Sequence, residues 1–538
     1  MFSSDSFIEG SNVSIAHLGL VSASYDSLGI CEIVDHLLPK KRAYKIGHGT
    51  LLKAMLLNCL GFVERRLYVY PEFFEDLAIS RLLGENITAS ELNDDVLGRT
   101  LDAIAAYGPT ELFNEIVVNC LLKSDYGTYC LHVDTTTFSV SGEYDADFDS
   151  RDMTITYGHS KDGRRDLKQF VLGMATDQRG IPLFLQTFSG NESDKKTILE
   201  IIQHLTDNLK HVGKVYHVAD AAFYTADNLT TLGTHTFWIS RVPATLNEVK
   251  NLISSDLELT PCADKRYQYV ERLSEYGDIP QKWVMYQSEM QQKRQEKTFQ
   301  KTLEKEKKTA ETSLRKLCAQ EFACEPDARR AAENWLKERS FFSFSSLDVL
   351  VSTRKKTKKQ GRPRVDEEME EVYSFFAEIA YNEEEVQLRR QKLGRFVLAT
   401  NDLELSPDEL LTQYKEQGTV ERGFRFLKDP SFRVSEIYLK KTSRIQALAM
   451  VMVLCLFIYS TTEFDLRQKL EEAGEIILGP EKRPMKNPTL KAVFSKFRGV
   501  NELKFKQEEG VHVVVTNMKP ELWRILKLMG ERYEEYYL

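Results

Sequence analysis

The 538-residue sequence lacks any C-x-x-C pair, although it holds eight cysteines. Scattered cysteines favour reduced thiols in a cytosolic protein and argue against a disulfide framework or a zinc–thiolate site. The first twenty residues lack a basic segment followed by an apolar core, so no secretory signal is expected. The longest apolar run, 447–459, spans 13 residues. A bilayer needs ~20, so we expect a buried core helix there rather than a membrane span.

The chain also lacks an excess of positive charge, because its formal net charge is -8. That value argues against a wholly basic coat for nucleic acid, so local basic patches matter more than the total. The 42% apolar and 28% charged residues are ordinary for a folded soluble protein. The length predicts about three or four structural units.

The period of the apolar residues changes along the chain. A helical pattern in the first part includes a capping box at Thr88 and Glu91, and it fits either a helix-turn-helix or a helical scaffold without DNA contact. From residue 128 the order is strand, strand, strand, helix, strand, helix, strand, which predicts a mixed α/β sheet. We expect five regions: a helical N-terminal region that binds DNA ends, the first part of the core, an insertion with a charged helix near 286–340, the second part of the core, and a C-terminal region (1–125, 126–245, 246–395, 396–465 and 466–538).

The segment YKEQGTVERGFRFLKDP, residues 414–430, continues a helix that begins with capping residues at 406–409. Steps of seven residues drift only about 20° on a helix. The pattern therefore predicts one helix face that carries Tyr414, Glu421 and Lys428. Gly418 and Gly423 each cost roughly 1 kcal/mol of helix propensity, which close approach of a ligand or tight packing would explain.

Three carboxylates stand out, because Asp134 and Asp220 each end an apolar strand and Glu421 lies on the later helix. The carboxyl ends of neighbouring parallel strands meet at one edge of a sheet. Oxygen ligands suit Mg²⁺, and two such ions about 4 Å apart serve displacement at phosphorus. Taken singly, a strand-end Asp is more often a turn residue and a helical Glu is more often solvated.

Five segments together resemble consecutive blocks of DDE-type insertion-sequence transposases. They are HVDTTTFSVSGEY (132–144), YGHSKDGRRDLKQ (157–169), SGNESDKKT (189–197), VADAAFYT (218–225) and YKEQGTVERGFRFLK (414–428). The last block fits the insertion-sequence-four superfamily, whose pattern is Y-x-x-R-x-x-x-E-x-x-x-x-x-x-K. The resemblance covers about residue 85 to 459 and implies an RNase H-like mixed α/β core interrupted by an insertion domain, with helical N-terminal and C-terminal regions.

By this resemblance Asp134, Asp220 and Glu421 bind two Mg²⁺ ions, for which Mn²⁺ can substitute, and catalyse strand cleavage. Tyr414 and Lys428 would contact DNA beside the Glu. Gln417 stands where the family carries Arg, and it offers a phosphate hydrogen bonds without a charged fork. Arg422 and Arg425 would compensate only in part, because neither lies on quite the same face.

Other residues keep two interpretations. Residues 422–444 hold seven Lys or Arg against two acids, a net +5 that attracts phosphate or is simply solvated. The basic segment 354–364 has a G-R-P core similar to an AT-hook, although a solvated loop is the more common case. Arg241 is a candidate phosphate contact, and Trp238 is more often a core residue than a base-stacking one. His132 and His159 stay unassigned, and Lys161, Arg164 and Lys168 belong to a matched block or to an ordinary hairpin.

The resemblance implies a transposase that binds the terminal inverted repeats of its element, hydrolyses the end phosphodiesters and joins the ends to target DNA. Its partners would be double-stranded DNA and a second copy in a homodimeric synaptic complex. The protein would be cytoplasmic, bacterial and nucleoid-associated, with no membrane. The alternatives are a catalytically inactive DNA-binding or domesticated protein, and a metal-dependent nuclease without strand transfer.

Overall fold

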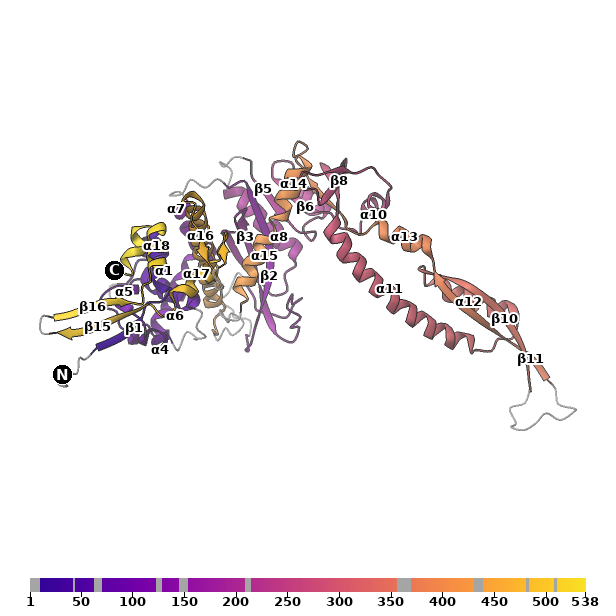
Figure 1. Ribbon diagram of the computed structural model, residues 1–538, viewed down its shortest axis with the longest axis horizontal. Coiled ribbons are helices and arrows are strands. Elements are labelled where there is room, and N and C mark those ends of the chain that lie inside the picture. Colours follow the sequence, from indigo (N-terminus) through magenta and orange to yellow (C-terminus); the bar gives the residue numbers. More distant parts are fainter. Residues whose placement is uncertain are drawn as a thin grey trace. The chain divides into compact units, whose positions relative to one another are not determined.

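The computed structural model describes ten stretches of the chain: 10–41, 44–61, 70–121, 128–144, 153–208, 214–355, 369–429, 439–479, 483–507 and 510–538. The fold divides into two units (Figure 1). Unit 1 comprises residues 1–240, 276–279 and 411–538, and unit 2 comprises 241–275 and 280–410. Along the chain, unit 2 therefore stands between the strands of unit 1 and the helix that carries Glu421.

The sheet of unit 1 has the strand order β4-β3-β2-β5-β6. The strands β2, β3 and β4 are antiparallel neighbours, whereas β5 runs parallel to both β2 and β6. Their bounds are β2 Cys130–Val140, β3 Lys168–Asp177, β4 Pro182–Ser189, β5 Tyr216–Ala219 and β6 Phe237–Arg241. With α8 (Asp194–Asn208) and α9 (Ala226–Leu232), this is the strand and helix order that the sequence predicts.

Helices cover both faces of this sheet. A methyl group at Gly173 on β3 would stand 2.3 Å from Ile201 of α8, so that helix packs closely on one face. The opposite face holds α15 (Gly418–Leu427) and α16 (Thr442–Glu472), where Gln446 of α16 donates to Thr187 of β4 at 3.1 Å. The mixed α/β class is therefore confirmed, with a helix-covered sheet at its centre.

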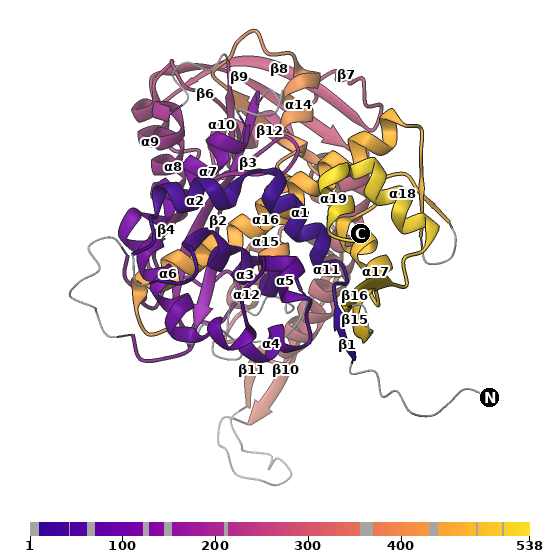
Figure 2. The same cartoon turned by 90° about the vertical axis from the view of Figure 1, so that its left-hand side faces the viewer.

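The helix α16 is the central element of the helical part of unit 1 (Figure 2). It is long and apolar enough to cross a membrane, but 72% of its most apolar window is buried inside the protein. The interpretation as a core helix is thus confirmed, although the helix extends well beyond the apolar run. The N-terminal helices are α1 Leu18–Ser27, α2 Ile30–Leu37, α3 His48–Leu60, α4 Tyr70–Glu75, α5 Ile79–Leu83, α6 Asp94–Tyr107 and α7 Pro109–Leu121.

The C-terminal residues pack against these N-terminal helices. The Tyr537 hydroxyl donates to the Ala16 carbonyl at 2.7 Å and accepts from the Leu20 amide at 3.2 Å. Buried Lys53 on α3 pairs with Asp26 at 2.9 Å. The C-terminal elements are α17 Leu490–Phe497, α18 Pro520–Met529, α19 Glu531–Glu535, the pair β13 Ile477–Leu478 and β14 Pro484–Met485, and the sheet β1 Gly10–Ser14, β15 Asn501–Gln507 and β16 Gly510–Thr516.

Unit 2 combines antiparallel strands with long helices. Its strand order is β12-β9-β8-β7, and the hairpin β10–β11 packs against α11 and α12 around buried Phe375. The bounds are β7 Thr260–Pro261, β8 Tyr267–Tyr276, β9 Ile279–Ser288, β10 Phe342–Lys355, β11 Met369–Tyr381, β12 Arg395–Thr400, α10 Asn247–Ser254, α11 Glu289–Cys318, α12 Glu325–Lys337 and α13 Glu383–Gln391. The charged span near 286–340 is therefore two helices.

The expectation of one helix from 407 to 430 is wrong. α14 (Pro407–Lys415) ends at Lys415 and α15 begins at Gly418, with a turn at Glu416 and Gln417 between them. The Thr419 amide donates to the Glu416 carbonyl at 2.8 Å, a bond from residue i+3 to i that tightens the turn. Tyr414 therefore does not share one continuous helix face with Glu421, although Glu421 and Lys428 still do.

The structure also bears on the cysteines and on the capping box at Thr88. All eight cysteines are free thiols, as predicted. The capping box of Thr88 and Glu91 is present, but it closes a 3-10 turn, η2 Ala89–Glu91, while α6 has its own cap at Asn93.

Eleven residues of α3 are buried, so α3 offers no exposed face to read DNA as the second helix of a helix-turn-helix would.

Candidate active site

Asp134 on β2 and Asp220, directly after the neighbouring parallel strand β5, lie side by side. Cys130 pairs with Tyr216 and His132 with Val218, so two residues further on Asp134 and Asp220 face one another across β2 and β5. Neighbouring strands lie about 4.8 Å apart, and residues two apart point to the same face. The structure therefore brings these two carboxylates together at the carboxyl end of β5.

The electrostatics of Asp134 are those of a crowded acidic site. Burial raises the pKa of Asp134 to about 6, with smaller contributions in the same direction from the negative charges of Asp220 and Asp194. Lys161 and the Thr135 amide, which donates to the carboxylate at 2.7 Å, act in the opposite direction. Burial and repulsion together favour the proton on this carboxyl unless a cation balances the charge.

Sequence reasoning missed Asp194 and left Lys161 undecided. The Lys161 ammonium lies 3.2 Å from a carboxylate oxygen of Asp194 and 4.0 Å from one of Asp134. It also donates to the backbone oxygen and the hydroxyl of Thr135, at 2.7 and 2.9 Å, and that hydroxyl donates to Asp194 at 2.6 Å. Both residues lie in segments that carry the family resemblance, which was the only sequence signal for them.

The helix α15 covers the face of the sheet to which Asp134 belongs. Asp134 pairs in register with Met174 of β3, and a methyl group at Gly423 of α15 would meet the Met174 side chain at 3.0 Å. Near the start of the helix, Thr419 lies 3.4 Å from Thr176, hydroxyl to hydroxyl, one same-face step along β3. Glu421 lies between Thr419 and Gly423 along α15, and its side chain is exposed.

The other end of α15 closes the same side of the site. The Lys428 ammonium donates to Asp162 at 2.8 Å and lies 5.6 Å from the centre of the Phe138 ring on β2. Asp162 neighbours Lys161 in the chain, so one turn links the end of α15 to Asp134. Lys428, at the end of α15, thus lies beside the turn that carries Lys161.

The remaining candidates on this segment differ in placement. Glu421, Arg422 and Arg425 are exposed on α15. Gln417 precedes the first residue of the helix and makes no capping hydrogen bond with its side chain. Arg241 belongs to unit 2, where its guanidinium lies 5.6 Å from the centre of the Phe396 ring.

The described residues contain no group of three or more His, Cys, Asp or Glu side chains close enough to hold a metal ion. Asp134 and Asp220 therefore lie near one another without a closed ligand shell. Their chemistry still suits a hard divalent cation, because carboxylate oxygens are the ligands that Mg²⁺ prefers. The raised pKa of Asp134 comes chiefly from burial of its carboxyl, which a bound cation would offset.

The basic segment 422–444 is less available than its composition suggests. Arg444 makes two hydrogen bonds to Asp102 of α6, at 2.7 and 2.6 Å, and this pairing lowers the pKa of that carboxyl. Lys428 is paired with Asp162, and Arg433 lies outside the described residues. Residues 356–368, with the AT-hook-like core, are also outside them.

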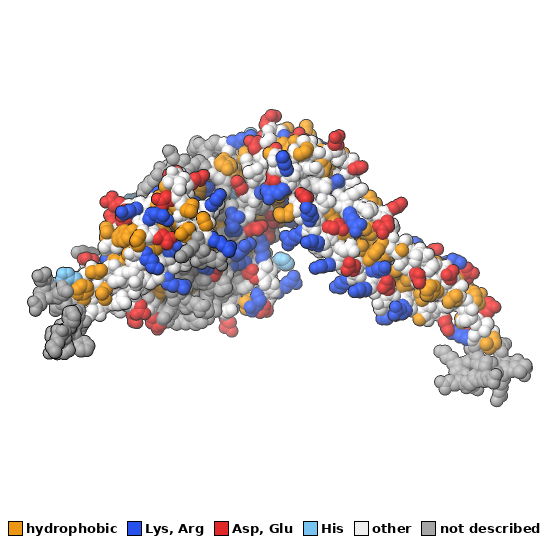
Figure 3. Space-filling view, in the orientation of Figure 1, with side chains coloured by type: hydrophobic (Ala, Val, Ile, Leu, Met, Phe, Trp, Pro, Cys, Tyr) orange, Lys and Arg blue, Asp and Glu red, His pale blue; other side chains and the backbone are white. Residues whose placement is uncertain are grey.

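A second basic region belongs to unit 2. The helix α11 holds nine Lys or Arg against five Glu, a net +4. Figure 3 shows blue side chains along the lower side of this helix. A long helix with an excess of cations is suited to follow a phosphate backbone.

Trp238 and His132 are buried in the core, whereas His159 is not. Trp238 is fully buried and packs edge-on against Phe223 and Tyr224, so its interpretation as a core residue is confirmed. Burial lowers the pKa of His132 to about 4, which keeps this fully buried ring neutral at ordinary pH. His159 is exposed.

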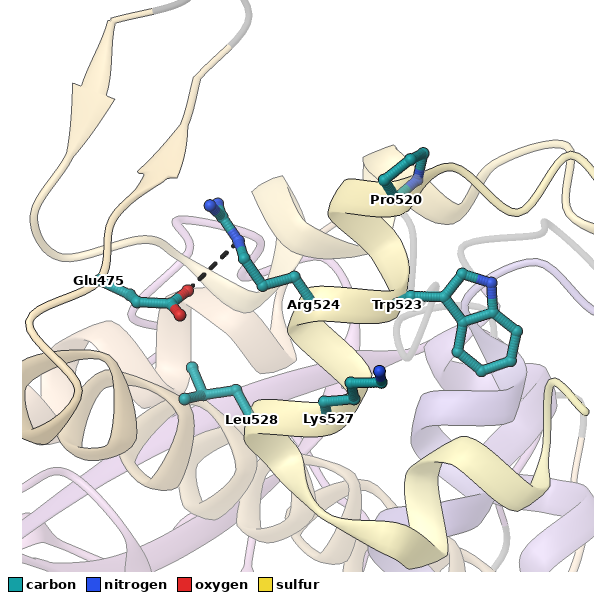
Figure 4. A pocket seen from close by; sticks show the side chains of 6 residues that line it. All are labelled: Glu475, Pro520, Trp523, Arg524, Lys527 and Leu528. Atoms are coloured by element: carbon teal, nitrogen blue, oxygen red, sulfur yellow. Dashed lines mark ion pairs between the residues drawn. The ribbon is translucent and has the colours of Figure 1, made fainter.

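Two grooves lie elsewhere on unit 1. One, of about 730 Å³, runs along α18 and is lined by Trp523, Arg524 and Lys527 (Figure 4). Arg524 pairs there with Glu475 at 3.2 Å. The other, of about 400 Å³, lies between α3 and α6, with His48 and Arg99 in its lining. The three acids line neither groove.

The helix-covered mixed sheet defines an RNase H-like core. Residues 127–458 match the family model described as a transposase DDE domain, and residues 11–118 match a domain of unknown function, DUF4277. The first match covers more than half of the chain, so the chain belongs to the transposase DDE domain family. It is a transposase, and this family implies DNA as its partner. None of the curated proteins compared with the chain matches it.

Proposed function

We propose that this transposase binds the terminal inverted repeats of its own insertion sequence, cleaves the ends by metal-dependent hydrolysis and joins them to target DNA. Asp134, Asp220 and Glu421 would be its catalytic acids, in the branch of the insertion-sequence-four superfamily. The observation that carries the proposal is the register that brings Asp134 beside Asp220, while α15, the helix that carries Glu421, packs on the same face of the sheet.

The three acids would hold the divalent ions, two Mg²⁺ or Mn²⁺, once DNA adds its phosphate oxygens. Such ions polarise a phosphodiester and lower the pKa of bound water. In the chain without metal, Lys161 provides the positive charge beside Asp134 and Asp194. The Thr135 amide orients the carboxylate of Asp134.

The DNA contacts would come from residues that surround these acids. Lys428 would exchange its carboxylate partner Asp162 for a phosphate, and Arg422 and Arg425 are exposed beside Glu421. Tyr414 and Gln417 would contribute from α14 and the turn. Unit 2 would offer DNA contacts of its own at Arg241 and along α11. The helical N-terminal region would recognise the repeat, and a cytoplasmic homodimer would hold two ends.

The test incubates the full chain with labelled element ends, target DNA and Mg²⁺. Cleavage followed by joining supports the proposal. Cleavage without joining identifies a nuclease, and binding without cleavage identifies a catalytically inactive DNA-binding protein. The DNA that flanks the gene provides the end sequences, because the proposal requires inverted repeats there.

A further inference from the structure

The hairpin β15–β16 has an open outer edge. It extends from the helices of unit 1 (Figure 1), and the sheet order β1-β15-β16 leaves β16 at the end. No described strand pairs with its outer side. The opposite border of the sheet is partly bonded, since Ser14 on β1 exchanges backbone hydrogen bonds with Asp76 and Ala78, at 2.7 and 3.0 Å.

The register of the hairpin determines which backbone groups face outward. Ser14 of β1 bonds outward to Asp76 and Ala78, so Asn501, its partner in register on β15, bonds instead to Thr516 of β16. The pairs then alternate, so the amide and carbonyl groups of Val511, Val513 and Val515 point away from β15. His512 and Val514 instead bond inward.

The side chains along this edge offer no protection against pairing. Val511, Val513 and Val514 are 66%, 45% and 48% exposed. The stretch 511–516, VHVVVT, contains no Lys, Arg, Asp, Glu or Pro. Soluble proteins usually protect an exposed edge strand with such residues, because an unprotected apolar edge pairs with another chain.

We propose that β16 pairs antiparallel with β16 of a second copy of this chain, so that two sheets join across a twofold axis at Val513. This arrangement places Val513 opposite its own copy and Val511 opposite Val515 of the partner subunit. Cross-strand pairs of β-branched residues are favourable, and no like charges meet. A twofold contact of a strand with itself is closed, so the assembly stops at a dimer.

The proposal does not depend on catalysis, and it gives the homodimer a specific surface. A second copy is favoured over DNA as the occupant because the outward groups of β16 are backbone and valine. Groups that bind DNA phosphate are mainly cationic. Lys504, which stands opposite Val513 on β15, is paired with Glu502 at 3.1 Å.

The test uses paired cysteine variants of the full chain, Val513→Cys and Val514→Cys, under a mild oxidant. On the proposed axis the two 513 side chains are directly opposite, within reach of a disulfide, whereas the two 514 side chains are diagonal and about 7–8 Å apart. We expect Val513→Cys to form covalent dimers at least about fivefold faster than Val514→Cys. The wild type, with its eight native cysteines, gives the background.

Sedimentation of the full chain without DNA is the second experiment, and it measures the strength of the dimer. Proline at 513 removes an outward amide and keeps the β15–β16 bonds, so Val513→Pro should weaken the dimer at least tenfold, whereas Val514→Thr should not. A monomeric wild type, equal cross-linking at 513 and 514, or a Val513→Pro dimer of normal strength would overturn the proposal. So would a Val513→Pro variant that loses only DNA binding. Asp134→Asn should dimerise normally, which separates this result from any failure of the proposed catalysis.

Discussion

Lys161 connects the residues that surround Asp134. Its ammonium contacts two carboxylates and two oxygens of Thr135, while its side chain is only 32% exposed. Because a partly exposed ion pair contributes little to folding, the value of Lys161 lies in the local charge that it provides. The site is therefore better described as two carboxylates with a fixed counter-charge than as isolated acids.

We predict that Lys161→Met lowers end cleavage at least tenfold and lowers the free energy of unfolding by less than about 1 kcal/mol. Without the ammonium, the negative charges of Asp134, Asp194 and Asp220 would repel the phosphate of the DNA. Single-turnover cleavage and thermal unfolding measure the two effects. Arg164→Met is the matched control, because Arg164 pairs with exposed Asp166 in the same segment. Equal losses in the two variants would contradict the assignment.

The raised pKa of Asp134 predicts a pH dependence of metal binding. The folded chain without metal binds this proton up to about pH 6, above the ordinary value of 3.8, so ionisation of Asp134 costs folding free energy as the pH rises through that interval. A divalent ion needs the ionised form. Mn²⁺ affinity should therefore fall as the pH drops from about 7 to 5.

Calorimetric titration at several pH values measures this affinity. Asp134→Asn should bind more weakly and lose most of the dependence between those pH values. Asp166→Asn, at an exposed carboxylate, should keep it. A wild-type affinity that is constant from pH 5 to 7 would show that the proton on Asp134 does not compete with the metal.

At the scale of elements, the packing of α15 determines where Glu421 lies. A methyl group at Gly423 would stand 3.0 Å from Met174 of β3 and 3.0 Å from Leu456 of α16. The tight packing that the sequence left as one of two explanations is therefore the structural reason for this glycine. Gly418 has open space, with only the end of Arg422 at 3.8 Å.

Gly423→Val should lower the free energy of unfolding by about 1–3 kcal/mol and reduce cleavage more than DNA binding, because it moves α15 away from the sheet. Gly418→Ala is the matched control in the same helix, and it should be neutral or slightly stabilising. Denaturant unfolding and cleavage assays measure both. Tolerance of valine at 423 would show that α15 does not need this close contact.

The order of strands could be predicted from the sequence, because apolar runs are local patterns. Asp220 directly follows β5, as expected, but the expectation that Asp134 ends its strand is wrong, because β2 continues past it to Val140. The break between α14 and α15 could not be predicted, since Glu416 and Gln417 are ordinary helix formers and the turn forms where α15 docks on the sheet. The network of Lys161 and Asp194 was also inaccessible, because it depends on a contact between segments more than thirty residues apart.

At the scale of the whole molecule, the two ends of the chain share one body. Besides Tyr537, the Arg81–Glu502 pair at 2.6 Å joins α5 to β15. The segment that matches DUF4277 is therefore completed by C-terminal residues that lie beyond both family matches. A truncated chain that ends after the DDE domain should lose this support for the N-terminal helices.

Tyr537→Phe should lower the apparent stability of unit 1 by about 1 kcal/mol, because it removes the hydrogen bond to the half-buried Ala16 carbonyl, whereas the Leu20 amide keeps its bond to the His17 carbonyl at 3.0 Å. Thermal unfolding followed by tryptophan fluorescence measures the shift. Leu538→Ala, at a residue that is 72% exposed, is the control and should leave the transition unchanged. Equal transitions in all three proteins would show that the C-terminus does not support the N-terminal helices.

The most direct test of the central claim is the cleavage and joining of labelled element ends by the wild type, Asp134→Asn, Asp220→Asn and Glu421→Gln. The account predicts cleavage and joining with Mg²⁺ by the wild type. Each variant should lose at least about a thousandfold in rate, because each removes a metal ligand, while folding and binding the ends normally. Near-normal cleavage by any folded variant would contradict the assignment of that acid.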